Sequence, residues 1–158
     1  MVILRETGVD LERLEEIGRR LAQVLRPGDV VLLFGPLGAG KTTLIRVVAR
    51  ALGVTDTVRS PSFTIANIYS GAVTVNHLDL YRLEGIEAED ALALEEYLTA
   101  DAVVLIEWPE AGRDRLEEPT FEIHLEHESL QTRSVRVEAG SEAGAARWAA
   151  ADPGEGGL

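Results

Sequence analysis

The stretch VVLLFGPLGAGKTT, residues 30–43, decides the fold. It contains the pattern Gly-x-x-x-x-Gly-Lys-Thr, which runs from Gly35 to Thr42 and follows five consecutive apolar residues. Glycines let the backbone turn without Cβ clashes, so that successive N–H groups point at phosphate oxygens. We therefore interpret the stretch as a buried strand, a phosphate-binding loop and the start of a helix.

The polar side chains of this loop favour nucleotide binding. Lys41 would bring a compact positive charge to the β- and γ-phosphates, and Thr42 would offer a hydroxyl to Mg²⁺. The alternative is a glycine-rich turn that matches the pattern by chance. Lys41 is the only lysine among 15 lysine and arginine residues. A flexible ammonium fits between phosphates in a way that a planar guanidinium does not, so the single lysine at this position supports the first interpretation.

Length and composition predict one globular domain. The chain has 158 residues, of which 46% are hydrophobic and 27% charged. We expect residues 1–139 to form a single domain, and residues 140–158 to be an Ala/Gly-rich tail that is partly disordered from about Ala151 onward. The absence of cysteine excludes disulfides and thiolate metal sites. No signal peptide or membrane span is evident, so we interpret the protein as cytoplasmic.

The net charge of the chain is −12. Such an acidic surface repels phosphate backbones except at a local basic patch, and the arginines form no dense cluster along the sequence. Strong direct binding of nucleic acid is therefore not expected.

Hydrophobic periodicity together with the glycine-rich loop predicts an α/β fold of the P-loop NTPase class, with a central, mainly parallel sheet, flanking helices and antiparallel strand pairs. Helices are expected at residues 10–25, 43–52 and 87–98, the first of them capped by Asp10 or Thr7. Strands are expected at residues 2–4, 29–34, 63–69, 73–80, 101–107, 120–127 and 133–139.

Two acidic residues fall at the ends of predicted strands. Glu107 ends a buried apolar run, and ligands of open α/β sheets bind at that edge, so Glu107 and the phosphate-binding loop should face one crevice. Asp79 stands where an acid meets Mg²⁺ or orients a water, or else it is a solvated carboxylate. His77 is interpreted as a packed or hydrogen-bonded residue. Trp108 either fills the core, packs over the nucleotide or marks a docking surface.

Three further positions have two interpretations each. Ser60-Pro61-Ser62-Phe63 is either a simple turn or a loop whose hydroxyl contacts Mg²⁺ and the γ-phosphate. Arg133 forms a surface salt bridge or reaches the nucleotide. Thr7 and Arg133 are our candidates for the nucleoside side of the site.

These landmarks together resemble the bacterial TsaE (YjeE) family of small P-loop ATPases. The matching segments are LFGPLGAGKTT at 33–43, SPSF at 60–63, HLDLYRL at 77–83 and IEWPE at 106–110. The P-loop alone occurs in many families, but the ordered set within one short chain is specific. The resemblance covers residues 1–139 and does not extend into the tail.

The resemblance implies ATP hydrolysis with Mg²⁺ in support of the threonylcarbamoyladenosine modification of tRNA, together with the proteins TsaB and TsaD. It implies catalytic roles for Lys41, Asp79 and Glu107, and Mg²⁺ ligation by Thr42, Asp79 and Glu107. The implied nucleotide-binding residues, beside the candidates Thr7 and Arg133, are Gly35, Pro36, Leu37, Gly38, Ala39, Gly40, Lys41, Thr42, Thr43, Ser62 and Trp108. Pro36 stands where the family often has an acidic residue, and Ser62 where it often has threonine.

Two other functions remain open at this point. A small-molecule kinase would need an acceptor pocket and usually a cationic lid, whereas residues 83–101 form an acidic segment. A nucleotide-dependent switch or scaffold with negligible turnover would carry the same loop. Partner-stimulated phosphate release separates the ATPase from the switch.

Overall fold

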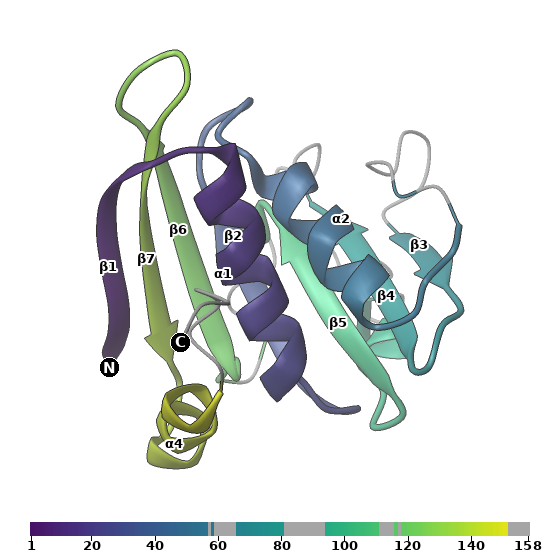
Figure 1. Cartoon of the computed structure of the whole chain (residues 1–158). Helices are drawn as coiled ribbons and strands as arrows, with labels where there is room; N and C mark the ends of the chain where they lie inside the picture. Colours follow the sequence, from purple (N-terminus) through teal and green to yellow (C-terminus); the bar gives the residue numbers. More distant parts are fainter. Residues whose placement is uncertain (57, 59–65, 81–93, 111–115, 117, 152–158) are drawn as a thin grey trace.

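A seven-stranded mixed sheet organises the chain, in the order β1-β7-β6-β2-β5-β4-β3 (Figure 1). The computed structural model describes residues 1–56, 58, 66–80, 94–110, 116 and 118–151. The strands are β1 Val2–Val9, β2 Val30–Phe34, β3 Ala66–Tyr69, β4 Thr74–Asp79, β5 Ala102–Glu107, β6 Phe121–His127 and β7 Arg133–Ala139. The helices are α1 Leu11–Val24, α2 Lys41–Ala51 and α4 Glu142–Ala150.

The strand that precedes the glycine-rich loop lies at the centre of the sheet. β2 pairs in parallel with β5 on one side and with β6 on the other, and β5 pairs in parallel with β4. Val31, Leu32 and Leu33 are each at most 1% exposed. Burial on both faces explains why the strand is a continuous apolar run rather than an alternating one.

Helices α1 and α2 cover one face of the sheet (Figure 1). Asp10 caps α1, because its side chain accepts a hydrogen bond from the backbone N–H of Arg13, 2.8 Å away. Gly18 lets the two helices approach closely, since a Cβ there would lie 2.8 Å from Cγ1 of Val47. The close approach fixes α2, and therefore the loop before it, against the rest of the domain.

The opposite face of the sheet has its own apolar cluster. Successive residues of a strand point to opposite faces, so Val103 and Leu105 of β5 pack under α1 and α2, while Val104 and Ile106 pack on the other side. The second cluster also includes Leu32, Leu78, Leu80 and Leu94. By the same alternation, Glu107 shares the helix-covered face with Val103 and Leu105.

The expected α/β architecture is confirmed, including the antiparallel pairs β3–β4 and β6–β7. The N-terminal strand is longer than expected, since pairing with β7 extends it to Val9. The helix expected at residues 87–98 and the strand expected at 63–69 fall partly on residues outside those described.

Residues 142–150 differ from the sequence-based expectation of an Ala/Gly-rich tail outside the domain. They form α4, which Ser141 caps by accepting a hydrogen bond from the N–H of Gly144. Trp148 is 3% exposed and packs beside Phe121 in the main core. Arg147 donates hydrogen bonds to Asp29 at the start of β2. The helix is therefore part of the domain, and residues 152–158 lie outside those described.

An ion pair between Glu6 and Arg13 ties β1 to α1, with 2.6 Å between Oε2 and Nη2. The hydrogen bonds from Arg13 hold the pKa of Glu6 below its usual value. A lowered carboxyl pKa stabilises the fold above the usual pKa of glutamate, and this stabilisation is lost as the pH falls through the lower pKa of the folded state.

We therefore expect Glu6→Gln to lower the free energy of unfolding by about 0.5–1 kcal/mol at pH 7, because both side chains are partly exposed and solvent screens the pair. Urea unfolding between pH 7 and pH 3 measures this difference, which should shrink toward acid pH. Glu15→Gln is the matched control, since its contact with Arg19 is long, at 3.9 Å, and exposed. An equal loss in both variants, or one that does not depend on pH, would contradict the prediction.

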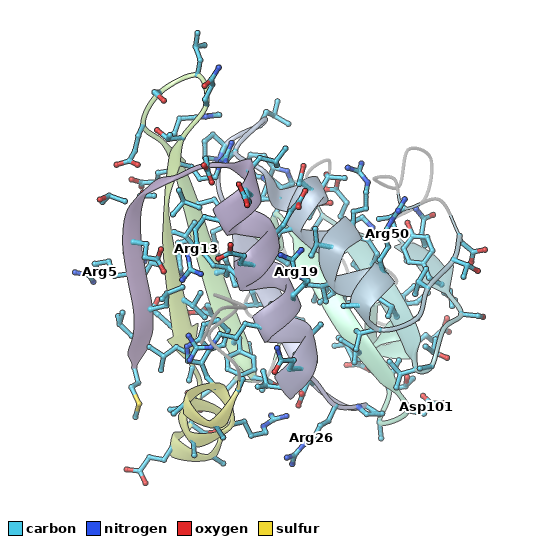
Figure 2. The ribbon with its side chains drawn as sticks, in the orientation of Figure 1. Arg5, Arg13, Arg19, Arg26, Arg50 and Asp101 are labelled. Atoms are coloured by element: carbon cyan, nitrogen blue, oxygen red, sulfur yellow. The ribbon has the colours of Figure 1, made fainter. Side chains whose placement is uncertain are left out.

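The labelled arginines are distributed over β1, α1, α2 and the segment after α1 (Figure 2). Arg5, Arg19 and Arg50 lie apart from one another in this view. Among the described residues, no helix is both long and apolar enough to cross a membrane.

Candidate functional site

An open pocket of about 200 Å³ lies where β2, β4 and β5 end. These three strands run parallel, so the residues that follow them meet at one edge of the sheet. The lining combines the loop after β2, the start of α2 and the ends of β4 and β5: Leu37, Gly38, Gly40, Lys41, Thr42, Thr43, Asp79, Glu107 and Trp108. The predicted meeting of the loop with Glu107 is therefore observed, and Asp79 lines the same pocket.

The backbone of the loop has the conformation that an anion site needs. Gly40, the residue before α2, has φ 111°, and no side chain caps the helix there. The first N–H groups of α2 thus remain directed toward the pocket, at the positive end of the helix dipole. Gly35 has φ 153°, and a Cβ there would lie 2.7 Å from the carbonyl oxygen of Leu125. Both glycines are required by the fold as well as by the loop.

Lys41 lies almost wholly inside the protein and is 4% exposed. Its Nζ donates to the carbonyl oxygen of Gly35 and lies 3.3 Å from the centre of the Trp108 ring. Burial lowers the pKa of Lys41, although nearby carboxylates act in the opposite direction, namely Glu107, Asp79 and Glu110. A cation that is costly to bury gains from any anion that approaches it, so the side chain is suited to hold a phosphate.

Glu107 is 3% exposed and uses both carboxylate oxygens. Oε1 accepts from the hydroxyl of Thr42, 3.3 Å away, and Oε2 lies 2.7 Å from Nε2 of His77. Asp79 pairs with Glu107 in the register of β4 and β5, so the two acids leave the sheet side by side. One hydroxyl and two carboxylates then face the same pocket.

Trp108 follows β5 with φ 52°, in the left-handed region that non-glycine residues rarely adopt. The turn places its indole ring over Lys41 rather than in the core. Of the three interpretations of Trp108, the structure excludes core filling. A strained backbone beside a pocket is typical of functional sites.

The family model described as "Threonylcarbamoyl adenosine biosynthesis protein TsaE" matches residues 9–135. The chain belongs to the TsaE family. The match spans the P-loop, both strand-end acids and Arg133, so every central feature of the pocket lies within it.

Curated relatives of this TsaE-family chain are "tRNA threonylcarbamoyladenosine biosynthesis protein TsaE" from Streptomyces coelicolor and from Bacillus subtilis. The first is 39% identical over 147 residues, which cover 88% of this chain and 96% of the relative. The second is 38% identical over 128 residues, covering 80% of each chain. A crystal structure of YdiB from Bacillus subtilis superposes with a TM-score of 0.77 at 31% identity and covers 93% of both chains.

The candidates for the nucleoside side of this TsaE-family pocket differ in position. Arg133 lies against the loop, with Nε 3.6 Å from where a Cβ of Gly40 would be, and it donates to the carbonyl oxygen of Val9. Thr7 is an exposed residue of β1 that does not line the pocket, and Asp10 rather than Thr7 caps α1. Ser62 lies outside the described residues.

Sequence reasoning missed one residue that supports the loop. His127, at the end of β6, lies with Nε2 3.1 Å from the carbonyl oxygen of Leu37. The same ring lies 3.7 Å from where a Cβ of Gly38 would be. A histidine 90 residues from the loop in sequence gives no local signal of this contact, which depends on the pairing of β2 with β6.

Nucleotide binding is expected to change the fluorescence of Trp108, because phosphates would draw the Lys41 ammonium away from the indole ring. Emission spectra recorded during titration with ATP or ADP measure the change. The other tryptophan, Trp148, is buried in the core and gives a constant background. Trp108→Phe is the control and should abolish the change while nucleotide still binds. A change that persists in Trp108→Phe would contradict the assignment.

Proposed function

We propose that this protein is a Mg²⁺-dependent ATPase that supports the threonylcarbamoyladenosine modification of tRNA, acting with TsaB and TsaD. One observation carries the proposal: the P-loop lysine, the Thr42 hydroxyl and two strand-end carboxylates line one pocket. The printed names of the curated relatives supply the pathway. The partners follow from the family resemblance of the sequence.

The pocket suits the phosphates of a nucleotide. Uncapped N–H groups at the start of α2 and the ammonium of Lys41 converge on it, and both favour anions. Among the described residues, a buried lysine and a helix N-terminus come together here, because Lys41 is the first residue of α2. A phosphate that pairs with Lys41 offsets the free-energy cost of burying its ammonium, and this offset contributes to the binding of the phosphates.

The pocket also suits Mg²⁺, which prefers oxygen ligands. Thr42, Asp79 and Glu107 offer a hydroxyl and two carboxylates, and Thr42 and Glu107 already contact each other. When bound, the ion would neutralise phosphate charge. Metal sites of this kind use few protein ligands, and the substrate phosphates and water complete them.

In the proposed reaction, water attacks the terminal phosphorus of ATP and ADP leaves. Lys41 would stabilise negative charge on the phosphate oxygens, and this stabilisation matters most at the transition state. Glu107 would orient the attacking water or hold Mg²⁺, and Asp79 would contribute to the same two roles. Trp108 covers Lys41 and would limit the access of bulk solvent.

The acidic surface agrees with a role through protein partners. The net charge of the chain is −12. A protein that drives a tRNA-modifying assembly need not bind tRNA strongly itself.

Phosphate release with and without TsaB and TsaD tests the proposal, with the wild type and Glu107→Ala. We expect slow release alone, stimulation by the two partners together and loss of that stimulation in Glu107→Ala. Absence of stimulation together with preserved nucleotide binding would instead support the switch or scaffold. Formation of a phosphorylated small molecule in place of free phosphate would support the kinase.

A further inference from the structure

A chain of polar side chains, of which only Asn67 is half-buried and the others are buried, leads from β3 to the back of the candidate site. His77 of β4 is fully buried, and its Nε2 lies 2.7 Å from Oε2 of Glu107. On the other side of the ring, Nδ1 lies 3.5 Å from the hydroxyl of Tyr69. That hydroxyl accepts a hydrogen bond of 3.1 Å from Nδ2 of Asn67. Such a chain within a core is costly unless its members satisfy one another.

The contact with Glu107 decides which nitrogen of His77 carries a proton. A carboxylate only accepts hydrogen bonds, so Nε2 of His77 carries the proton that faces Glu107. The hydroxyl of Tyr69 takes a hydrogen bond from Asn67 and lies 3.5 Å from Nδ1 on the other side of the ring. The contact with Glu107 thus places a proton on Nε2, and the contacts on both sides set the orientation of His77.

The contacts of Glu107 with His77 and with Thr42 differ in length. The distance of 2.7 Å to His77 is short for a hydrogen bond to a carboxylate, whereas 3.3 Å to Thr42 is long for a hydroxyl donor. Of these two contacts, the one at the back oxygen is the closer, and the one at the front oxygen joins Glu107 to Thr42.

We propose that His77 is a positioning residue, which holds the back oxygen of Glu107 so that the front oxygen is presented to Thr42 and the bound metal or water. Tyr69 and Asn67 support it from β3. This inference rests on the proposed function, because it assigns Glu107 a role in that reaction. Partners of this kind orient ligating groups, and their loss commonly costs about 10- to 100-fold in metal affinity or activity.

Two substitutions of His77 separate positioning from packing. His77→Leu keeps an apolar side chain in the core but leaves Oε2 of Glu107 without its donor. His77→Gln can place an amide N–H near the position of Nε2 and should restore most of the function. Asn76→Leu is the matched control on β4, since Asn76 is also buried but bonds to the carbonyl oxygen of Tyr97 on the opposite face.

The first measurement is kinetic. Phosphate release with TsaB and TsaD should show kcat about 10- to 100-fold lower for His77→Leu, with little change in KM and near recovery in His77→Gln. The gain in ATP affinity on adding Mg²⁺, compared with EDTA, should shrink in parallel. Asn76→Leu should lose thermal stability without either effect. Equal defects in the leucine and glutamine variants, or unchanged kcat and Mg²⁺ dependence in a folded His77→Leu, would overturn the proposal.

The second measurement does not depend on activity. Nitrogen NMR of ¹⁵N-histidine distinguishes the two neutral tautomers, and the signal of His77 is the one that disappears in His77→Gln. We expect the Nε2-protonated form, and protonation at Nδ1 alone would overturn the proposal. If the wild type hydrolyses no ATP under any condition, the proposed ATPase fails, while the tautomer and the Mg²⁺ dependence of binding still decide the role of His77.

Discussion

Lys41→Ala is expected to lower the affinity for ATP by about 100-fold or more, because it removes the cation that would contact the phosphates by charge-assisted hydrogen bonds. Calorimetric titration with ATP and with ADP measures the loss. The stability of the folded state should change much less than the ATP affinity. Burial lowers the pKa of Lys41, so its charged form is costly in the absence of a phosphate.

Lys41→Met is the matched control for this experiment. Methionine keeps an apolar stem beside Trp108 and lacks the ammonium, so it should bind ATP as poorly as the alanine variant. Its melting temperature should equal or exceed that of the wild type, since no cation is buried. Retained ATP affinity in both variants would show that the loop does not hold the phosphates, and partner-stimulated hydrolysis would then need another site.

Glu107→Gln is expected to reduce partner-stimulated hydrolysis by about 100- to 1,000-fold while ATP binding stays largely intact. The amide keeps the shape of the carboxylate and its carbonyl oxygen can still accept from His77, but the negative charge is lost. Single-turnover phosphate release and ATP affinity, measured on the same preparation, separate the two effects.

Glu107→Ala provides the comparison. It leaves Nε2 of His77 buried without an acceptor, and a buried unsatisfied donor costs about 1–3 kcal/mol, so this variant should also be less stable than Glu107→Gln. Unchanged turnover in Glu107→Gln would remove the carboxylate from the mechanism. Loss of ATP binding in step with turnover would make Glu107 a binding residue instead.

Local patterns were sufficient to predict much of the fold. The apolar positions of α1 recur at helical spacing, and Asp10 is the residue that caps it. β2 and β5 are short apolar runs that end at the loop and at Glu107. Because the carboxyl ends of parallel strands meet at one edge, the shared crevice also followed from the sequence.

Helix α4 was not predictable in the same way. Its alanines and glycine indicate a flexible tail, because they supply little apolar surface for a core. The position of the helix is set by Trp148 in the main core and by the contact of Arg147 with Asp29, 118 residues earlier in the chain. Tertiary contacts override weak local preference here.

The contacts among the site residues also could not be predicted from the sequence. The cation–π contact of Lys41 with Trp108 and the hydrogen bond of His77 with Glu107 each join residues from different strands or loops. A histidine on an apolar strand indicates burial, not the partner that it will find. The register of β4 and β5 decides the partner. It pairs Asp79 with Glu107 and so brings His77, which precedes Asp79 on the same face of β4, next to Glu107.

The order of the sheet has a consequence for how the chain folds during synthesis. β2 is flanked by β5 and β6, and β1 pairs with β7, so the earliest strands find their partners among the latest. The β3–β4 and β6–β7 hairpins are local. The central strand β2, in contrast, cannot pair with β5 and β6 until residues 102–127 have emerged from the ribosome. Long-range pairing of this kind slows folding and leaves apolar strands exposed in the nascent chain. The pocket beside Lys41 can thus form only after β5 has emerged, when more than half of the chain is already outside the ribosome.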